Sequence, residues 1–272
     1  MFSKLFFKKQ AVVEAEASKK IKPKIAPERI GDLGEYKINI QLDQLPKDCK
    51  TLSNVMLHNS KSKSGYSQID HIIISPYTIF VIETKNYAGT IYGDVKRPNW
   101  SVNGKFPMMN PFHQNYGHIK AIHNLLPHTD MSQFVSMVSF TKRSTFKVNE
   151  ELRKIQSNEL IVYDTELSEF IARKINVLKM TTKSVAFSEE QINEIHVVLS
   201  SKNVLDPHLR ANHIKHIKSS VSIEESQAKQ ITKAVCHTCG IEVSEKVSNF
   251  CSANKARFKG DIYCFEHQKL YK

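Results

Sequence analysis

The chain has 272 residues, 40% hydrophobic and 24% charged, which are proportions of a globular protein rather than a disordered one. Its formal net charge of +12 favours a polyanionic partner, nucleic acid before an anionic membrane surface, although a basic protein without such a partner is the alternative. No apolar run reaches the length of a membrane span, so we expect no stable membrane insertion.

The five cysteines are distributed unevenly, because four of them lie after residue 235. A secreted disulfide framework favours an even number of cysteines spread along the chain. Clustered cysteines at short spacing instead indicate zinc in a reducing compartment. We therefore expect a cytoplasmic protein.

The first 29 residues, rich in Lys and Ala, indicate a basic tail or linker. From residue 30 the apolar spacing becomes helical, and it predicts a helix that also carries Glu35. The residues placed on one face of this helix are Ile30, Leu33, Tyr36 or Lys37, and Ile40.

Residues 50–57 are predicted to form the first strand, and the polar residues 59–65 a loop. Two apolar runs rich in β-branched residues follow, at 68–75 and 79–86, and a Ser-Pro-Tyr-Thr sequence separates them. Their length and composition, with the proline break, predict two buried strands joined by a tight turn.

Charged residues stand at the ends of these two strands, where they are costly unless paired, solvated or bound to metal. Asp70 lies near the start of the first strand, and Glu83 and Lys85 lie at the end of the second. Side chains two residues apart share a strand face, and a hairpin brings the start of its first strand beside the end of its second. Two carboxylates and an ammonium group at one place suit Mg²⁺ or Mn²⁺ and a phosphate. The alternative is an ion-pair network without metal.

Further strands are predicted at 89–93 and 100–105. The second contains Trp100, the only tryptophan, for which we expect a packing role. A helix should then extend from Asn110 and Pro111 to residue 126, because Asn is a favoured N-cap and Pro suits the first helical position.

This helix carries several polar side chains. Gln114 is the one we expect to face Asp70 and Glu83, since a helical amide can orient a water or a phosphate. The histidines expected on the helix surface, rather than at a metal, are His113, His118 and His123.

Strands are predicted at 133–141 and 160–163, and helices at 164–174 and 188–200, the last with Ser188 and Gln191 as a capping box. This alternation predicts an α/β core, a mixed sheet with flanking helices, from residue 30 to residue 203. Residues 204–234 are basic and polar and indicate a linker or connecting helix with solvated histidines.

Residues 235–272 contain two short motifs with a two-residue gap. Cys236 and Cys239 form a CxxC turn followed by glycine, and Cys264 precedes His267 at the same spacing. These four residues predict a tetrahedral zinc site. Cys251 is the alternative fourth ligand in place of His267, but it lacks a partner at this spacing, and we expect a buried free thiol.

Several sequence blocks resemble, in order, those of the nuclease-related domain (NERD) family. They include Gly31-Asp32-Leu33-Gly34-Glu35, Gln68-Ile69-Asp70-His71, Phe80-Val81-Ile82-Glu83-Thr84-Lys85-Asn86, Gly89-Thr90-Ile91-Tyr92-Gly93 and Asn110-Pro111-Phe112-His113-Gln114. Asp70 with Glu83 and Lys85 matches the PD-(D/E)xK constellation of nucleases. The resemblance covers a little under half of the chain and implies a restriction-endonuclease-like fold.

The resemblance also implies a function and the residues that perform it. As in PD-(D/E)xK nucleases, Asp70 and Glu83 would bind Mg²⁺ or Mn²⁺, Lys85 would orient water, and Glu35 and Gln114 would assist in cleaving DNA. The cysteine segment is similar to small zinc ribbons such as topoisomerase C-terminal fingers, which implies zinc-assisted nucleic-acid binding. The alternative is a catalytically inactive DNA- or RNA-binding protein on a nuclease-like scaffold.

Overall fold

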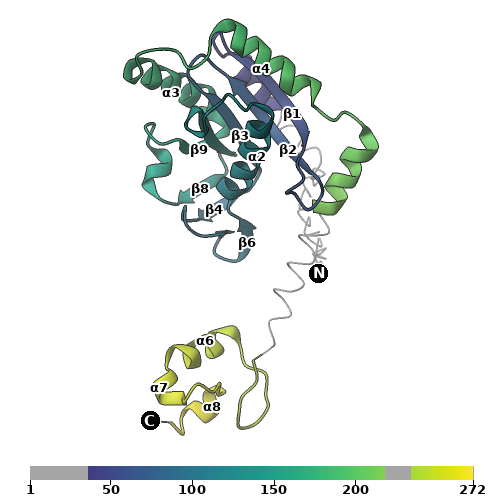
Figure 1. Cartoon of the computed structure of the whole chain (residues 1–272). Helices are drawn as coiled ribbons and strands as arrows, with labels where there is room; N and C mark the ends of the chain where they lie inside the picture. The colour runs from purple at the N-terminus through teal and green to yellow at the C-terminus, as the bar shows by residue number, and fades with distance from the viewer. Residues whose placement is uncertain (1–35, 218–233, 272) are drawn as a thin grey trace, which may run out of the picture.

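A computed structural model describes residues 36–217 and 234–271 (Figure 1). The predicted basic tail, the block 31–35 with Glu35, and the segment 218–233 lie outside these residues. Residues 36–42 are helical. The buried face of this helix carries Ile38 and Leu42, whereas Tyr36 and Ile40 are exposed, so the predicted face is wrong.

The central sheet has five strands in the order β1-β2-β3-β7-β9. Strands β1, β2 and β3 pair antiparallel, whereas β3-β7 and β7-β9 are parallel, which makes the sheet mixed. The strands are β1 (Lys50–His58), β2 (Tyr66–Ile74), β3 (Ile79–Lys85), β7 (Phe134–Phe140) and β9 (Glu159–Tyr163). The predicted hairpin is therefore confirmed as β2 and β3.

A second sheet has four strands in the order β6-β5-β4-β8. They are β4 (Gly89–Tyr92), β5 (Asn99–Val102), β6 (Phe106–Met109) and β8 (Ser144–Lys147). One face of this sheet shares an apolar cluster with β7 and β9, and Trp100, which is buried as expected, belongs to that cluster.

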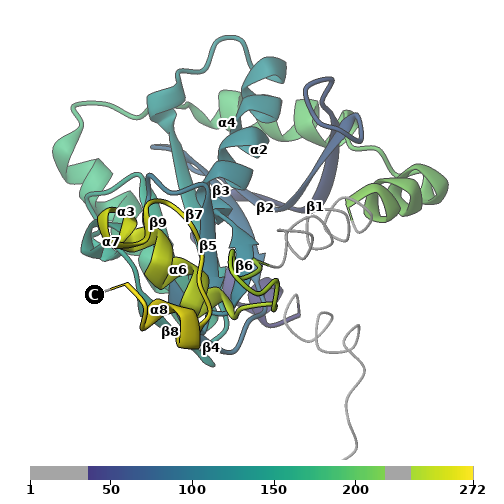
Figure 2. The ribbon, with the colours of Figure 1, turned by 90° about the horizontal axis from the view of Figure 1, so that it is seen from below.

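Helices cover both faces of the central sheet, because both faces are apolar. On one face lie α2 (Pro111–Leu125) and α4 (Glu189–Ser201), whose isoleucines pack on β1, β2 and β3. Figure 2 shows these two helices together on one side of the strands. On the other face lie residues 36–42 and α3 (Leu167–Thr181). The predicted α/β class, a mixed sheet flanked by helices, is thus confirmed.

Helix capping follows the sequence closely. Asn110 accepts a hydrogen bond from the amide of Phe112 at the start of α2, and Ser188 and Gln191 form the reciprocal capping box of α4. Short 3-10 turns occupy Met131–Gln133, Glu150–Arg153 and Asp164–Glu166. Within the described ranges, no helix combines the length and apolar character needed to cross a bilayer.

Residues 207–217 are helical and contact the β1-β2 pair. His213 on this helix is buried and contacts Ser64 Oγ, so the expectation of a solvated histidine is wrong there. The C-terminal residues form three short helices, α6 (Glu245–Ala253), α7 (Lys255–Phe258) and α8 (Phe265–Gln268). Their small core consists of Cys236, Cys251, Phe258 and Tyr263.

Candidate active site

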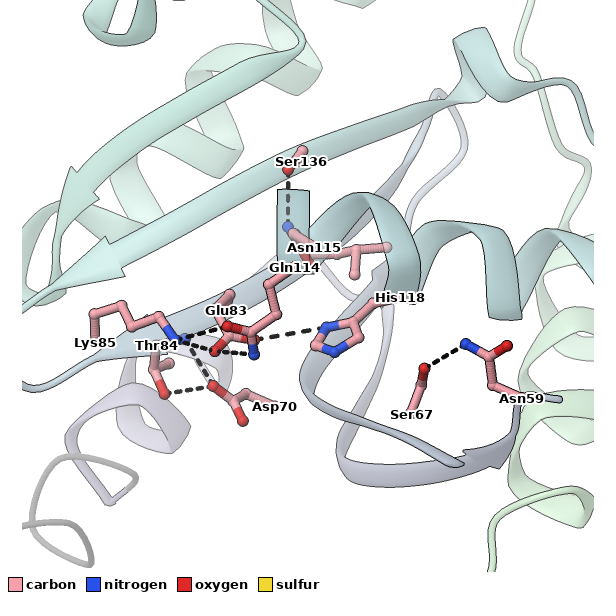
Figure 3. A network of polar contacts seen from close by, with 11 residues as sticks. Asn59, Ser67, Asp70, Glu83, Thr84, Lys85, Gln114, Asn115, His118 and Ser136 are labelled. Atoms are coloured by element: carbon pink, nitrogen blue, oxygen red, sulfur yellow. Dashed lines mark hydrogen bonds and ion pairs between the residues drawn. The ribbon is translucent and has the colours of Figure 1, made fainter. Parts of the chain in front are cut away.

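The β2-β3 hairpin brings the predicted acidic residues together. The antiparallel register pairs His71 with Ile82 and, continued by one residue, sets Asp70 opposite Glu83. Figure 3 shows the side chains of Asp70, Glu83, Lys85 and Gln114 converging at this end of the hairpin. Four of the five residues predicted for this site thus lie close together, and the fifth, Glu35, is outside the described residues.

Glu83 is the centre of a closely bonded group. Its Oε1 accepts hydrogen bonds from Lys85 Nζ at 2.7 Å and from Gln114 Nε2 at 2.8 Å. Lys85 Nζ also donates to Gln114 Oε1 at 2.9 Å, so three side chains from β3 and α2 form a closed ring. The expectation that Gln114 faces this site is confirmed.

Asp70 is held by the residue between Glu83 and Lys85. Its Oδ2 accepts from the backbone amide of Thr84 at 2.7 Å and from the Thr84 hydroxyl at 2.6 Å. These two bonds fix the carboxylate against β3 through one oxygen. Among the described residues, none donates a hydrogen bond to the other oxygen, Oδ1.

His118 differs from its predicted position on the helix surface. It lies one turn after Gln114 on α2 and is buried, with Nδ1 3.6 Å from Glu83 Oε2. Burial lowers the pKa of His118 to about 4, so the imidazole is neutral at pH 7 and this contact is no ion pair. The contact is also too long for a hydrogen bond.

A second residue that was not predicted from the sequence fixes α2 against the sheet. Asn115 is fully buried, and its amide donates to the carbonyl of Val81 at 2.7 Å and to Ser136 Oγ at 2.9 Å. It thereby anchors α2 to β3 and β7 beside Gln114. The sequence did not indicate this anchoring role, because an Asn in a helix shows no pattern that distinguishes a buried side chain from an exposed one.

The electrostatics of Glu83 suit a cation. Its Oε2 is buried and accepts no hydrogen bond from any described residue. Burial raises the pKa of Glu83 to about 7 although Lys85 and Gln114 act to lower it. A carboxylate kept from water with one free oxygen is costly, and a divalent cation would satisfy that oxygen. The residues present therefore fit Mg²⁺ or Mn²⁺.

Lys85 stays protonated. Burial lowers its pKa, but the nearby charges of Glu83 and Asp70 outweigh this effect and leave the pKa above its ordinary value. In the described chain, no third histidine, cysteine or carboxylate completes a compact ligand group with Asp70 and Glu83. The remaining positions around a cation would be filled by water and phosphate, as Mg²⁺ prefers.

The cysteine segment forms a separate group that could hold a metal such as zinc. The ligand atoms of Cys236, Cys239, Cys264 and His267 all lie within 4.8 Å of one another. The Sγ atoms of Cys239 and Cys264 are 3.9 Å apart. Tetrahedral zinc with bonds of about 2.3 Å separates its sulfur ligands by about 3.8 Å.

Cys251 lies outside this group. It is buried in the core of the segment, where its Sγ accepts from the amide of Tyr263 at 3.4 Å and from Gln268 Nε2 at 3.3 Å. The expectation of a buried free thiol agrees with this position. Its role as the alternative fourth ligand has no geometric support.

Part of the sequence matches a known protein family. Residues 30–141 match the nuclease-related domain family. An uncharacterized protein of Bacillus anthracis, pXO1-01, is 31% identical over 200 residues, which span 71% of this chain and 86% of that protein.

Among solved structures, a protein of unknown function, AF1548, aligns with 62% of this chain and 97% of its own, at 10% identity and a TM-score of 0.26. So low a score supports no argument about fold or function. The family match and the Bacillus anthracis relative are sufficient by themselves. The chain belongs to the nuclease-related domain family.

Proposed function

We propose that this protein is a metal-dependent DNA nuclease that hydrolyses phosphodiester bonds at the Asp70–Glu83–Lys85 site. The main support is the buried Glu83 Oε2, which no described residue satisfies, beside a protonated lysine and a second carboxylate. A binding surface without chemistry needs no such group. Nucleases need a cation site and a positive charge at one phosphate.

Each residue has a role that follows from its contacts. Asp70 and Glu83 hold Mg²⁺ or Mn²⁺. Asp70 contributes the carboxylate that Thr84 orients, and Glu83 contributes Oε2. When bound, the cation supplies charge stabilisation for the phosphate and a more acidic water. Gln114 fixes Glu83 and Lys85 relative to each other. The resemblance assigns an assisting role to Glu35.

Lys85 acts as a cation rather than as a base, since its pKa lies above the ordinary value. Its ammonium group donates to Glu83 and Gln114, which leaves one of its three donors for a water or a phosphate oxygen. A fixed positive charge at this position stabilises the negative charge that develops on the phosphate.

The cysteine segment would bind zinc and assist nucleic-acid binding. Basic side chains surround it, and the exposed Phe265 ring lies 5.2 Å from Lys269 Nζ. In such a pair the lysine can bind a phosphate of a nucleic acid and the aromatic ring can stack on a neighbouring base. We propose the unit boundaries 1–29, 30–203, 204–234 and 235–272, and a cytoplasmic location that keeps the thiols reduced.

A cleavage assay on single-stranded, duplex and branched DNA with Mg²⁺ or Mn²⁺ tests the proposal. We expect wild-type cleavage that chelation by EDTA abolishes and that Asp70→Asn and Lys85→Met each reduce by at least about 100-fold. Lys179→Met, which removes an exposed lysine on α3, should cleave like wild type. Cleavage retained by both site variants would contradict the proposal.

The second candidate is a non-catalytic DNA- or RNA-binding protein. The closed ring of Glu83, Lys85 and Gln114 favours this candidate, because these three side chains form hydrogen bonds with one another without a metal. Binding of DNA or RNA with no cleavage of any substrate, and with no divalent-metal affinity, would support this candidate instead.

A further inference from the structure

Strands β1 and β2 share an irregularity at the position of Asp70. Leu52 and Val55 on β1 pack in one apolar cluster, as do Ile69 and Ile72 on β2. In a regular strand, residues three apart point to opposite faces. In both strands the alternation of side chains between the two faces therefore changes at the same place, near Asn54 and Asp70. The pairing register of the two strands is the same on either side of this place.

This shift changes the direction in which the Asp70 side chain points. With regular alternation, Asp70 would point to the same face as Ile72 and Ile74, both fully buried in that cluster. The phase shift instead turns Asp70 toward Thr84, the residue between Glu83 and Lys85, whose amide and hydroxyl donate to its carboxylate.

Asn54 provides the shift on β1. It stands across from Asp70 in the register and adopts a left-handed backbone conformation with φ 53°. Most side chains are strained in this region, and Asn is among the residues that tolerate it best. The ladder is interrupted here between the pairs Ser53–His71 and Val55–Ile69. A cavity of about 130 Å³ lies at the interruption and is lined by Asn54, Gln68 and Asp70 among others.

A residue far along the chain holds Asn54 in this conformation. Arg210, on the helix of residues 207–217, donates through Nη1 to Asn54 Oδ1 at 2.8 Å and through Nη2 to the Asn54 carbonyl at 2.9 Å. Its guanidinium also donates to the Val204 carbonyl at 2.7 Å and to Asn203 Oδ1 at 2.9 Å. Gln68 on β2 completes the group by donating to Asn54 Oδ1 at 2.9 Å.

We propose that Arg210 and Asn54 are positioning residues for Asp70. Together they hold the break in the β1-β2 ladder that sets the direction of the Asp70 carboxylate. The inference rests on the proposed function, because it assigns Asp70 to a cation. Arg210 lies outside residues 30–141, the segment that matches the family, so this chain supports its active site with a helix from beyond that segment.

Divalent-metal affinity of the full chain, with zinc already bound, tests this inference. Isothermal titration with Mn²⁺ at one temperature well below unfolding compares wild type with Arg210→Met, Arg210→Lys and Asn54→Gly. Loss of a partner that orients a metal ligand typically weakens metal binding about 10-fold or more, and we expect this for both Arg210 variants. A lysine cannot make the paired contacts of the guanidinium, so it should not rescue the affinity.

The controls separate positioning from charge and from folding. Removing a positive charge near a cation site should by itself strengthen cation binding, so weaker binding reports a change in geometry. Arg173→Met, which breaks an exposed pair with Glu169 on α3, should bind Mn²⁺ like wild type. Glycine reaches the φ of Asn54 without strain but also adopts other conformations readily, so Asn54→Gly loses the contacts that hold the break without adding a clash. It should therefore weaken Mn²⁺ binding, and it remains informative if an Arg210 variant fails to fold.

The possible outcomes are distinct. In an Asp70→Asn background, Arg210→Met should cause no further loss, because both changes act on one ligand. Wild-type affinity in Arg210→Lys and Asn54→Gly would overturn the inference and leave the proposed function intact. A wild-type chain that binds no Mn²⁺ would overturn both.

Discussion

At the scale of single residues, Glu83 is the group whose chemistry is most constrained. Lys85 and Gln114 saturate one of its oxygens, while the other is buried without a hydrogen bond from the described chain. Burial raises its pKa to about 7. If a cation binds there as proposed, it competes with a proton for this carboxylate close to physiological pH.

This competition gives a pH prediction with a definite sign. Below pH about 7 Glu83 carries a proton that a cation must displace, so Mn²⁺ affinity should fall as the pH is lowered. Displacement of one proton corresponds to about a tenfold loss per pH unit. Above about 7 the affinity should level off. Isothermal titration between about pH 5.5 and 8.5 measures both parts of the curve.

Glu83→Gln is the control for this measurement, because it keeps the shape of the side chain and removes its titration. Its Mn²⁺ affinity should be weak and should vary less with pH. An equal pH dependence in wild type and Glu83→Gln would assign the effect to another group and contradict the role of Glu83.

Some site residues could be predicted from the sequence and others could not. Asp70, Glu83 and Lys85 could be predicted because charged residues at the ends of apolar strands are costly unless they are paired, solvated or bound to metal. His118 could not, since a single histidine at helical spacing gives the same pattern whether it is buried or exposed. Asn54 and Arg210 are 156 residues apart, and their contact depends on a backbone irregularity that no local pattern indicates.

At the scale of elements, local chemistry predicted the long and regular parts. Proline and β-branched residues marked the β2-β3 hairpin, and capping residues marked α2 and α4. Strands β6 and β8 were not predicted, because β6 contains a proline and β8 has a single apolar residue, so neither sequence resembles a strand. All seven residues of β7 are buried, because this strand lies inside the sheet with helices on both faces.

Replacing each of two glycines by alanine should change the stability of the protein in opposite directions. A Cβ at Gly93 would overlap the Trp100 ring, so Gly93→Ala should destabilise the protein by about 1–3 kcal/mol. Gly117 lies within α2 and has open space around it, so Gly117→Ala should stabilise the protein by up to about 1 kcal/mol. Urea unfolding of the two variants decides. A Gly93→Ala protein as stable as wild type would show that Trp100 does not pack tightly there.

At the scale of the whole molecule, the α/β core and the cysteine segment have different sources of stability. The core buries extended apolar clusters on both faces of its central sheet. The cysteine segment buries a cluster of four residues, two of them cysteines. So small a core cannot offset the entropy of folding, and a bound metal would contribute much of the stability of the segment.

Zinc content separates the two roles of cysteine in this segment. Protein purified under reducing conditions should contain about one zinc per chain, as one tetrahedral site requires. Cys239→Ser removes a ligand and should abolish this zinc, whereas Cys251→Ser should retain it, because Cys251 bonds Tyr263 and Gln268 instead. Elemental analysis measures both. Loss of zinc only in Cys251→Ser would exchange the assigned roles.

The position of a bound divalent cation is the most direct test of the active site. Crystals of the full chain soaked in Mn²⁺ and measured at the manganese absorption edge should show an anomalous peak within about 2.5 Å of Glu83 Oε2 and of an Asp70 oxygen. The peak should be absent from Glu83→Gln crystals. Manganese bound only elsewhere, with the Glu83–Lys85 pair unchanged, would contradict the assignment of this site to metal-dependent phosphodiester hydrolysis.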